Sequence, residues 1–287
     1  MKRIHGIASN PRVKWSGSEP ELRDDAWPNR PLLGFDLETT GVDPYDCRMV
    51  DMALVLDKGD DSDPIVWQWL INPECEIPLT ATAIHGINTD NARTNGVTAN
   101  IACEQIRTVL DEIGSTPPVC IYNAAYDTPI LLRESNLAIG HNWLILDAMV
   151  LDKMADAYRP GKRTLTAVNA AYGLGVKNAH RAAGDCISAI QVTRAIGRKY
   201  PEIGNADLRK LQAIQAEAYR EQANQFTEYR QTCGEPEFEC SLEWPYNAEM
   251  LGQMPNVAKP VCQYSDCGCN GFTGCLNSAY RYCALRE

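Results

Sequence analysis

The chain lacks long hydrophobic runs. Nowhere do its 287 residues approach the roughly 20 consecutive apolar residues that a membrane-spanning helix requires. Residues 1–25 also lack the apolar core of a secretory signal peptide. We therefore expect no membrane partner and a cytoplasmic location.

Basic charge is also scarce. The 27 Lys and Arg residues are outnumbered by 37 Asp and Glu residues, which gives a formal net charge of −10. This balance argues against a protein that coats nucleic acid, because binding to phosphates depends on Lys and Arg displacing counterions. The charge balance excludes neither a protein with a local basic groove nor an enzyme whose excess carboxylates hold metal ions. With 45% hydrophobic and 22% charged residues the composition is that of a globular protein, and it excludes a disordered or collagen-like chain.

Cysteine is unevenly distributed. Five of the 12 cysteines are scattered over residues 1–232, where they are expected to be reduced thiols, and seven fall in residues 233–287. Thiolates bind zinc tetrahedrally, and a small appended segment lacks a core of its own. The spacing is not that of two CxxC pairs, so disulfides or free thiols remain alternatives to zinc. The candidate zinc ligands are Cys262, Cys267, Cys269, Cys275 and Cys283.

The hydrophobic pattern predicts an α/β fold. After an N-terminal arm (1–30), strands are expected at 32–37, 49–56, 65–71 and 118–122, an apolar element at 144–153, and helices at 97–113, 128–137, 164–172 and 185–200. Strands followed by alternating helices and strands indicate a mixed β-sheet flanked by helices. This domain spans 31–204. A C-terminal helix (205–232) follows, whose residues 205–230 pack on the domain or on a protein partner, and a cysteine-rich tail covers 233–287.

Two carboxylates in the segment FDLETTG carry the strongest chemical signal. Asp36 and Glu38 are separated by one residue in a strand, so their side chains point to the same face. Neighbouring anions repel each other, and a hard divalent cation such as Mg²⁺ or Mn²⁺ would neutralise them. The alternative is an exposed acidic pair at a strand end.

Two further acidic positions follow later in the chain. Asp127 ends the segment YNAAYD, directly after a predicted strand, and Asp185 ends HRAAGD, which begins with His180. Each aspartate alone is explained as a helix N-cap. Helix capping does not explain why these two aspartates occur in one chain with His180 and the Asp36–Glu38 pair.

Taken together, these motifs resemble those of the DEDDh, or DnaQ-like, 3′–5′ exonucleases of the ribonuclease H-like superfamily. Asp36 and Glu38 match the first motif, Asn123 and Asp127 the second, and His180 with Asp185, spaced as H-x4-D, the third. The segment AIHGI at 83–87 is similar to one that in the family lies against the 3′-terminal nucleotide. The resemblance covers about residues 31–200. Tyr122 departs from it, because many members have His before the Asn, and this puts the substrate preference in doubt.

The resemblance implies a ribonuclease H-like fold and hydrolysis of phosphodiesters with two Mg²⁺ or Mn²⁺ ions, one activating water and one stabilising the leaving 3′-oxygen. The implied metal ligands are Asp36, Glu38, Asp127 and Asp185. His180 is the implied general base, since an imidazole accepts a proton near pH 7. The implied substrate contacts are Thr39, His85, Gly86, Ile87 and Asn123.

A basic segment adjoins the third motif. No acidic residue occurs between Tyr158 and Gly184. Lys162, Arg163 and Arg181 are therefore expected to line the path of the substrate backbone. The alternative is a solvated basic face.

The leading hypothesis is a metal-dependent 3′–5′ exonuclease that releases nucleoside monophosphates from the 3′ end of single-stranded or frayed DNA. RNA or short oligoribonucleotides are the alternative substrates, because the five catalytic residues do not report on the sugar. A non-catalytic nucleic-acid-binding adaptor is disfavoured, since a purely structural module does not need four carboxylates and a histidine. Proofreading, DNA repair and nucleotide recycling all remain open as roles.

Overall fold

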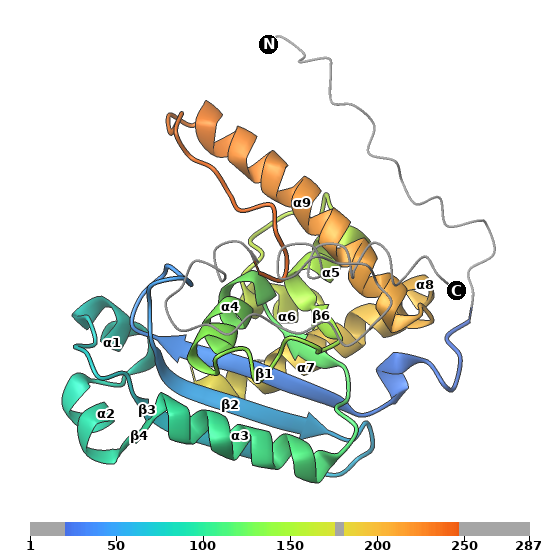
Figure 1. Cartoon of the computed structure of the whole chain (residues 1–287). Coiled ribbons are helices and arrows are strands. Elements are labelled where there is room, and N and C mark those ends of the chain that lie inside the picture. The colour runs from blue at the N-terminus through green and yellow to red at the C-terminus, as the bar shows by residue number, and fades with distance from the viewer. Residues whose placement is uncertain (1–20, 176–180, 247–287) are drawn as a thin grey trace, which may run out of the picture.

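The computed structural model describes residues 21–175 and 181–246 (Figure 1). Its centre is a six-stranded sheet in the order β4-β3-β2-β1-β5-β6. The strands β1, β2 and β3 pair antiparallel, whereas β4, β5 and β6 pair parallel to their neighbours. The mixed sheet expected from the sequence is confirmed. Its strands are β1 (Leu32–Thr39), β2 (Met49–Asp57), β3 (Ile65–Asn72), β4 (Val97–Thr98), β5 (Val119–Ile121) and β6 (Ile145–Asp147).

Helices cover both faces of the sheet, and each face has its own core. On one face, α3 (Ala99–Ile113) and α4 (Ala124–Glu134) bury apolar side chains against β1 and β2. On the other face, α7 (Ala182–Lys199) crosses the sheet and packs with α5 (Ala148–Ala155) and α6 (Leu165–Ala171). The sheet residues alternate between these two cores, as the period of two requires.

A long C-terminal helix, α9 (Leu208–Thr232), closes the free edge of the sheet at β6. Gln212 accepts from the Ile145 amide at 2.9 Å and donates to the Trp143 carbonyl at 3.3 Å. Gln215 accepts from the Asp147 amide at 2.8 Å and donates to the Ile145 carbonyl at 2.9 Å. Both glutamines are buried. Since an unpaired sheet edge leaves backbone groups without partners, these two amides replace a further strand.

Five short elements were not expected. They are η1 (Trp27–Asn29), α1 (Leu79–His85), α2 (Thr89–Asn95), β4 and α8 (Pro201–Gly204). Helices α1 and α2 lie beyond the end of β3 in Figure 1. Helices α1 and α2 bury only one or two side chains each, Ala81 and His85 in α1 and Ala92 in α2, so their sequences show no apolar period that could predict them.

The expected boundaries also differ from the structure at both ends of the domain. The interval 21–30, expected to belong to an arm, packs on the domain through Trp27, whose indole N–H donates to the Ile203 carbonyl at 2.8 Å. Within the expected tail, Trp244 and Tyr246 are buried. No helix in the described part of the chain combines the length and apolarity needed to span a membrane.

Candidate active site

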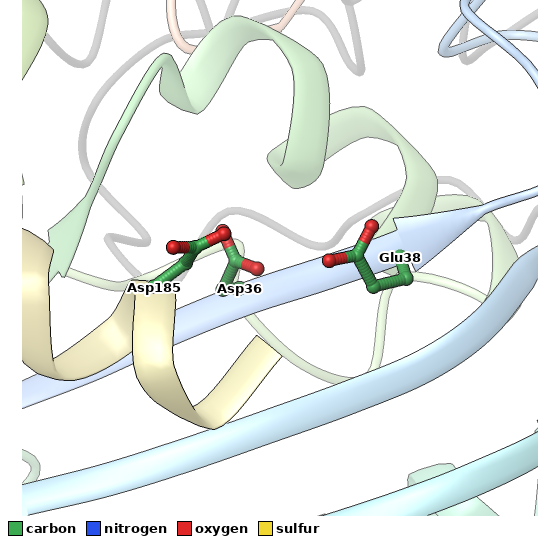
Figure 2. Close-up of side chains that lie close together, drawn as sticks. All are labelled: Asp36, Glu38 and Asp185. Carbon is green, nitrogen blue, oxygen red and sulfur yellow. The ribbon is translucent and has the colours of Figure 1, made fainter. Parts of the chain in front are cut away.

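Three acidic side chains meet at the sheet face that α7 covers. Asp36 and Glu38 project from the same face of β1, and Asp185 comes from the first turn of α7 (Figure 2). One carboxylate oxygen of each lies within 4.8 Å of those of the other two. The structure thus brings together three of the four sequence-predicted metal ligands.

The close approach of α7 to β1 depends on Gly34. A Cβ at this position would lie 2.9 Å from Cδ1 of Ile190 and 3.0 Å from both Cβ and the carbonyl oxygen of Cys186. Such contacts are shorter than ordinary van der Waals separations, so only glycine leaves room for the helix here. Asp185 precedes Cys186 in the helix, and Asp36 lies two residues beyond Gly34 on the same face of the strand. The missing side chain therefore brings the two aspartates together.

Asp127 lies next to the second half of β1, on the side where β5 has ended. The short strand β5 pairs with only the first part of β1, which leaves the Leu37 amide without a strand partner on that side. Asp127, in the first turn of α4, accepts from this amide through Oδ1 at 3.2 Å. Its side chain is 3% exposed. Asp127 lies outside the 4.8 Å group, yet it raises the pKa of Asp36 by Coulombic repulsion.

The electrostatics of the site favour protonation or a bound cation. Burial raises the pKa of Asp36 well above its ordinary value, and repulsion from Asp127, Asp185 and Glu38 raises it further. Burial and repulsion from Asp185 likewise raise the pKa of Glu38 to about 7. Burial also raises the pKa of Asp127. Charged carboxylates this close together are unfavourable without a compensating positive charge.

A fifth carboxylate, Asp51, adjoins the group and was missed by the sequence analysis. It lies opposite Glu38 in the β1–β2 register and is 3% exposed. Gln68 donates a hydrogen bond to it, and burial raises its pKa to about 6. The sequence did contain one signal for Asp51, because it is an acidic residue within the otherwise apolar run of β2. Its proximity to Glu38 follows from the strand register, which the sequence alone does not reveal.

Thr39 ends β1 beside the second motif. Its hydroxyl donates to the Gly41 carbonyl at 2.9 Å and is hydrogen-bonded to the Tyr126 hydroxyl. The Gly41 carbonyl is an alternative acceptor for the single Tyr126 hydroxyl proton. These bonds tie the end of β1 to α4, one residue before Asp127.

The segment 83–87 forms the end of α1 and the turn after it. His85 and Ile87 are buried, and His85 accepts from the Ile87 amide through Nδ1 at 3.1 Å. Gly86 adopts a φ of 78° at the helix C-cap, a conformation that favours glycine. Burial lowers the pKa of His85, while the Thr39 backbone opposes this shift. In this segment Ile84, which the sequence analysis did not select, is the exposed large apolar side chain, at 60%.

The predicted basic contacts fall into different environments. Arg181 is exposed at the N-cap of α7 and lowers the pKa of Glu38, so it adjoins the acidic group. Lys162 is exposed. Arg163 pairs with the buried Asp152 and donates to the Asp156 carbonyl at 2.6 Å. Because these bonds occupy its guanidinium, Arg163 has a structural role. From the sequence it was expected to line the path of the substrate backbone.

Asn123 begins α4 in a left-handed conformation with a φ of 69°. Together with Tyr126 and Tyr45 it lines a cavity of about 190 Å³ next to the second motif. The predicted general base, His180, lies outside the described residues, as do the five candidate zinc cysteines. Their assignments stay predictions.

The acidic group fits a hard divalent cation. Carboxylate oxygens are the ligands that Mg²⁺ and Mn²⁺ prefer, and three side chains offer them within 4.8 Å of one another. Burial and mutual repulsion raise the pKa of Asp36 and Glu38, and Arg181 offsets this only in part for Glu38. The donor set and the electrostatics therefore both suit a metal centre.

Comparison with solved structures identifies relatives of the same fold. The zinc-bound Escherichia coli exonuclease I–single-stranded DNA complex is 19% identical, with a TM-score of 0.51 over 67% of this chain and 43% of that chain. The complex of the same E. coli enzyme with a dT13 oligonucleotide is 20% identical, with a TM-score of 0.50 over 61% of this chain and 42% of that one. The chain thus matches less than half the length of these relatives. No curated protein sequence matches it.

A family comparison extends from the first motif to beyond the third. The RNase_T family, described as exonuclease, matches residues 33–193, which is more than half of the chain. These residues contain all four carboxylates, the whole of α4 and most of β1 and α7. Together with the mixed sheet, the match confirms the ribonuclease H-like fold and the resemblance based on the three motifs. The chain belongs to the DEDDh-type exonuclease family.

Proposed function

We propose that the protein is a metal-dependent 3′–5′ exonuclease that releases nucleoside monophosphates from the 3′ end of single-stranded or frayed DNA. The observation that carries this proposal is the convergence of Asp36, Glu38 and Asp185 within 4.8 Å, with Asp127 beside them. Membership of the exonuclease family supports it. An adaptor without activity would not need this costly grouping of buried anions.

In this proposal each residue has a defined task. Asp36, Glu38, Asp127 and Asp185 hold two divalent ions. When bound, the ions supply positive charge for the phosphate and the leaving oxygen and lower the pKa of water. His180 accepts the proton of the attacking water. Arg181, exposed next to the acidic group, attracts the phosphate backbone, and Lys162 extends this basic path.

We place the terminal nucleotide between the end of β1 and α1. Thr39, Asn123 and Gly86 border this region. The buried His85 adjoins the Thr39 backbone of β1, and the buried Ile87 packs with Val50 of β2. Ile84 then offers its exposed apolar side chain to a base. DNA is favoured as substrate because the structural relatives with TM-scores of 0.50 and 0.51 are complexes with single-stranded DNA.

RNA remains the alternative substrate, since the five proposed catalytic residues act on the phosphodiester and do not report on the sugar. Zinc binding by Cys262, Cys267, Cys269, Cys275 and Cys283 remains a proposal about the segment that follows the described residues. A protein partner for that segment is likewise proposed. We propose a role in DNA repair or proofreading on the condition that the protein has exonuclease activity on DNA.

The proposal is tested with full-length protein on 5′-labelled single-stranded DNA and RNA of matched sequence, with Mg²⁺, Mn²⁺ or EDTA. We expect metal-dependent shortening from the 3′ end, with DNA cut faster than RNA. Asp36→Asn should abolish cleavage and weaken Mn²⁺ binding in calorimetry. His180→Ala should lower kcat by roughly 10²–10⁴-fold with Mn²⁺ binding retained, as expected for loss of a general base.

Asp111→Asn is the matched control. This side chain is exposed on α3, on the opposite face of the sheet, so the variant should cut like the wild type. Wild-type cleavage by Asp36→Asn would exclude the assigned centre. Absence of cleavage of either nucleic acid by the wild-type protein would favour the adaptor hypothesis.

A further inference from the structure

Asp147, a fully buried carboxylate outside the acidic group, lies at the end of β6. It caps α5 by accepting from the Met149 amide at 3.0 Å and from the Val150 amide at 3.4 Å. Helix N-termini leave such amides without intrahelical partners, and an anion there is also favoured by the helix dipole. This much is an ordinary N-cap.

The same carboxylate also holds the beginning of α4. Its Oδ1 accepts from the Asn123 amide at 3.1 Å, and its Oδ2 accepts from the Ala124 amide at 2.8 Å. Asn123 has no side-chain cap of its own, so the N-terminus of α4 depends on Asp147. Asp127, the carboxylate that reaches the edge of β1, lies in the first turn of this helix. The direction of that turn determines where Asp127 lies relative to Asp36.

A fifth hydrogen-bond donor to Asp147 comes from a residue that follows the exonuclease domain in the sequence. The Trp244 indole N–H donates to Oδ2 of Asp147 at 3.1 Å, and the ring is 6% exposed in the core that also contains α4. Trp244 follows α9 and lies outside the family match, which ends at residue 193. The neighbouring Ser241 and Glu243 line the 190 Å³ cavity together with Asn123. The segment 238–246 therefore returns from α9 to the second motif.

We propose that Asp147 is a positioning residue of the nuclease centre and that Trp244 completes it, so that segment 238–246 is a working part of the catalytic unit. The proposal rests on the exonuclease function for its kinetic readout. A carboxylate shared by two helix N-termini and an indole has its orientation fixed by five donors, and hydrogen bonds to an ionised group are stronger than neutral ones. Removing the indole donor leaves the Ala124 amide as the remaining donor to Oδ2, so the carboxylate is held less firmly and the first turn of α4 loosens.

The test compares two Trp→Phe variants in the full chain. Trp244→Phe keeps a ring in the core but removes the bond to Asp147. Trp27→Phe is the matched control, because it also removes a buried indole N–H bond, 2.8 Å from the Ile203 carbonyl, at a place remote from α4. We expect Trp244→Phe to lower kcat roughly 10-fold with the oligonucleotide KM within about twofold, since small misplacements of a reacting group are costly. Trp27→Phe should leave both constants near wild type.

Hydrogen exchange separates this proposal from the proposed function. Faster exchange of the Asn123 and Ala124 amides in Trp244→Phe than in Trp27→Phe, with weaker Mn²⁺ binding, would support the positioning role even if no nuclease activity were found. Equal exchange at these amides in both variants would overturn it. Equal losses of kcat in both variants would also overturn it, because a general loss of stability would then explain the effect.

Discussion

Gly34 is required for the geometry of the acidic group rather than for its chemistry. Replacing it by Ala would place a Cβ 2.9 Å from Ile190 and 3.0 Å from Cys186, and the Cys186 carbonyl cannot move without the helix. We expect α7 to shift and carry Asp185 away from Asp36. Gly34→Ala should therefore lower the free energy of unfolding by about 1–3 kcal/mol, as overpacking does, and weaken Mn²⁺ binding. Urea denaturation and calorimetry measure the two effects.

Gly41→Ala serves as the control for this substitution. A Cβ at Gly41 would meet Cys47 at 3.5 Å, an ordinary contact, and its φ does not require glycine. Its unfolding free energy should stay within about 0.5 kcal/mol of the wild type, as surface changes usually do. If Gly34→Ala behaved in the same way, the close approach of α7 would not depend on the missing side chain.

Helix α9 functions as a substitute for an edge strand. Gln215→Leu would leave the Asp147 amide and the Ile145 carbonyl buried without partners. Each such group costs about 1–3 kcal/mol, so for the two groups we expect a loss of roughly 2–6 kcal/mol in unfolding free energy. Gln222→Leu is the control, since its side chain is partly exposed and makes a 3.4 Å bond to the Val150 carbonyl. A loss of similar size in the two variants would contradict this account of the edge.

Elements with a long regular pattern could be predicted from the sequence. The apolar run of β2 and the amphipathic pattern of α3 with its Thr98 cap are local signals, and both elements were correctly placed. The link between Gln215 and Asp147 joins positions 68 residues apart and has no local signal. The same limitation hid Asp51, because its partner Glu38 is set by strand register. Motif order selected Asp36, Glu38 and Asp185 from the sequence, and the structure places their carboxylates within 4.8 Å of one another.

The distribution of charge over the molecule links its stability to pH and metal. Five neighbouring carboxylates, Asp36, Glu38, Asp51, Asp127 and Asp185, contribute half of the formal net charge of −10. Burial and repulsion raise the pKa of Glu38 to about 7, and burial raises that of Asp51 to about 6, above their values in the unfolded chain. The folded protein therefore binds protons more tightly than the unfolded one. By linkage, the stability from these groups is complete below about pH 4 and is lost as pH rises towards 7.

A divalent cation should reverse this trend, because it binds the ionised carboxylates of the folded state. We expect Mg²⁺ or Mn²⁺ to raise Tm more at pH 8 than at pH 5, with about 2.7 kcal/mol gained at 100 times Kd. Thermal denaturation at several pH values, with and without metal, measures this. In Glu38→Gln both the fall in stability with pH and the metal effect should shrink, because one anion is gone. A metal-induced rise in Tm that is independent of pH, or unchanged in Glu38→Gln, would show that the cation binds elsewhere in the protein.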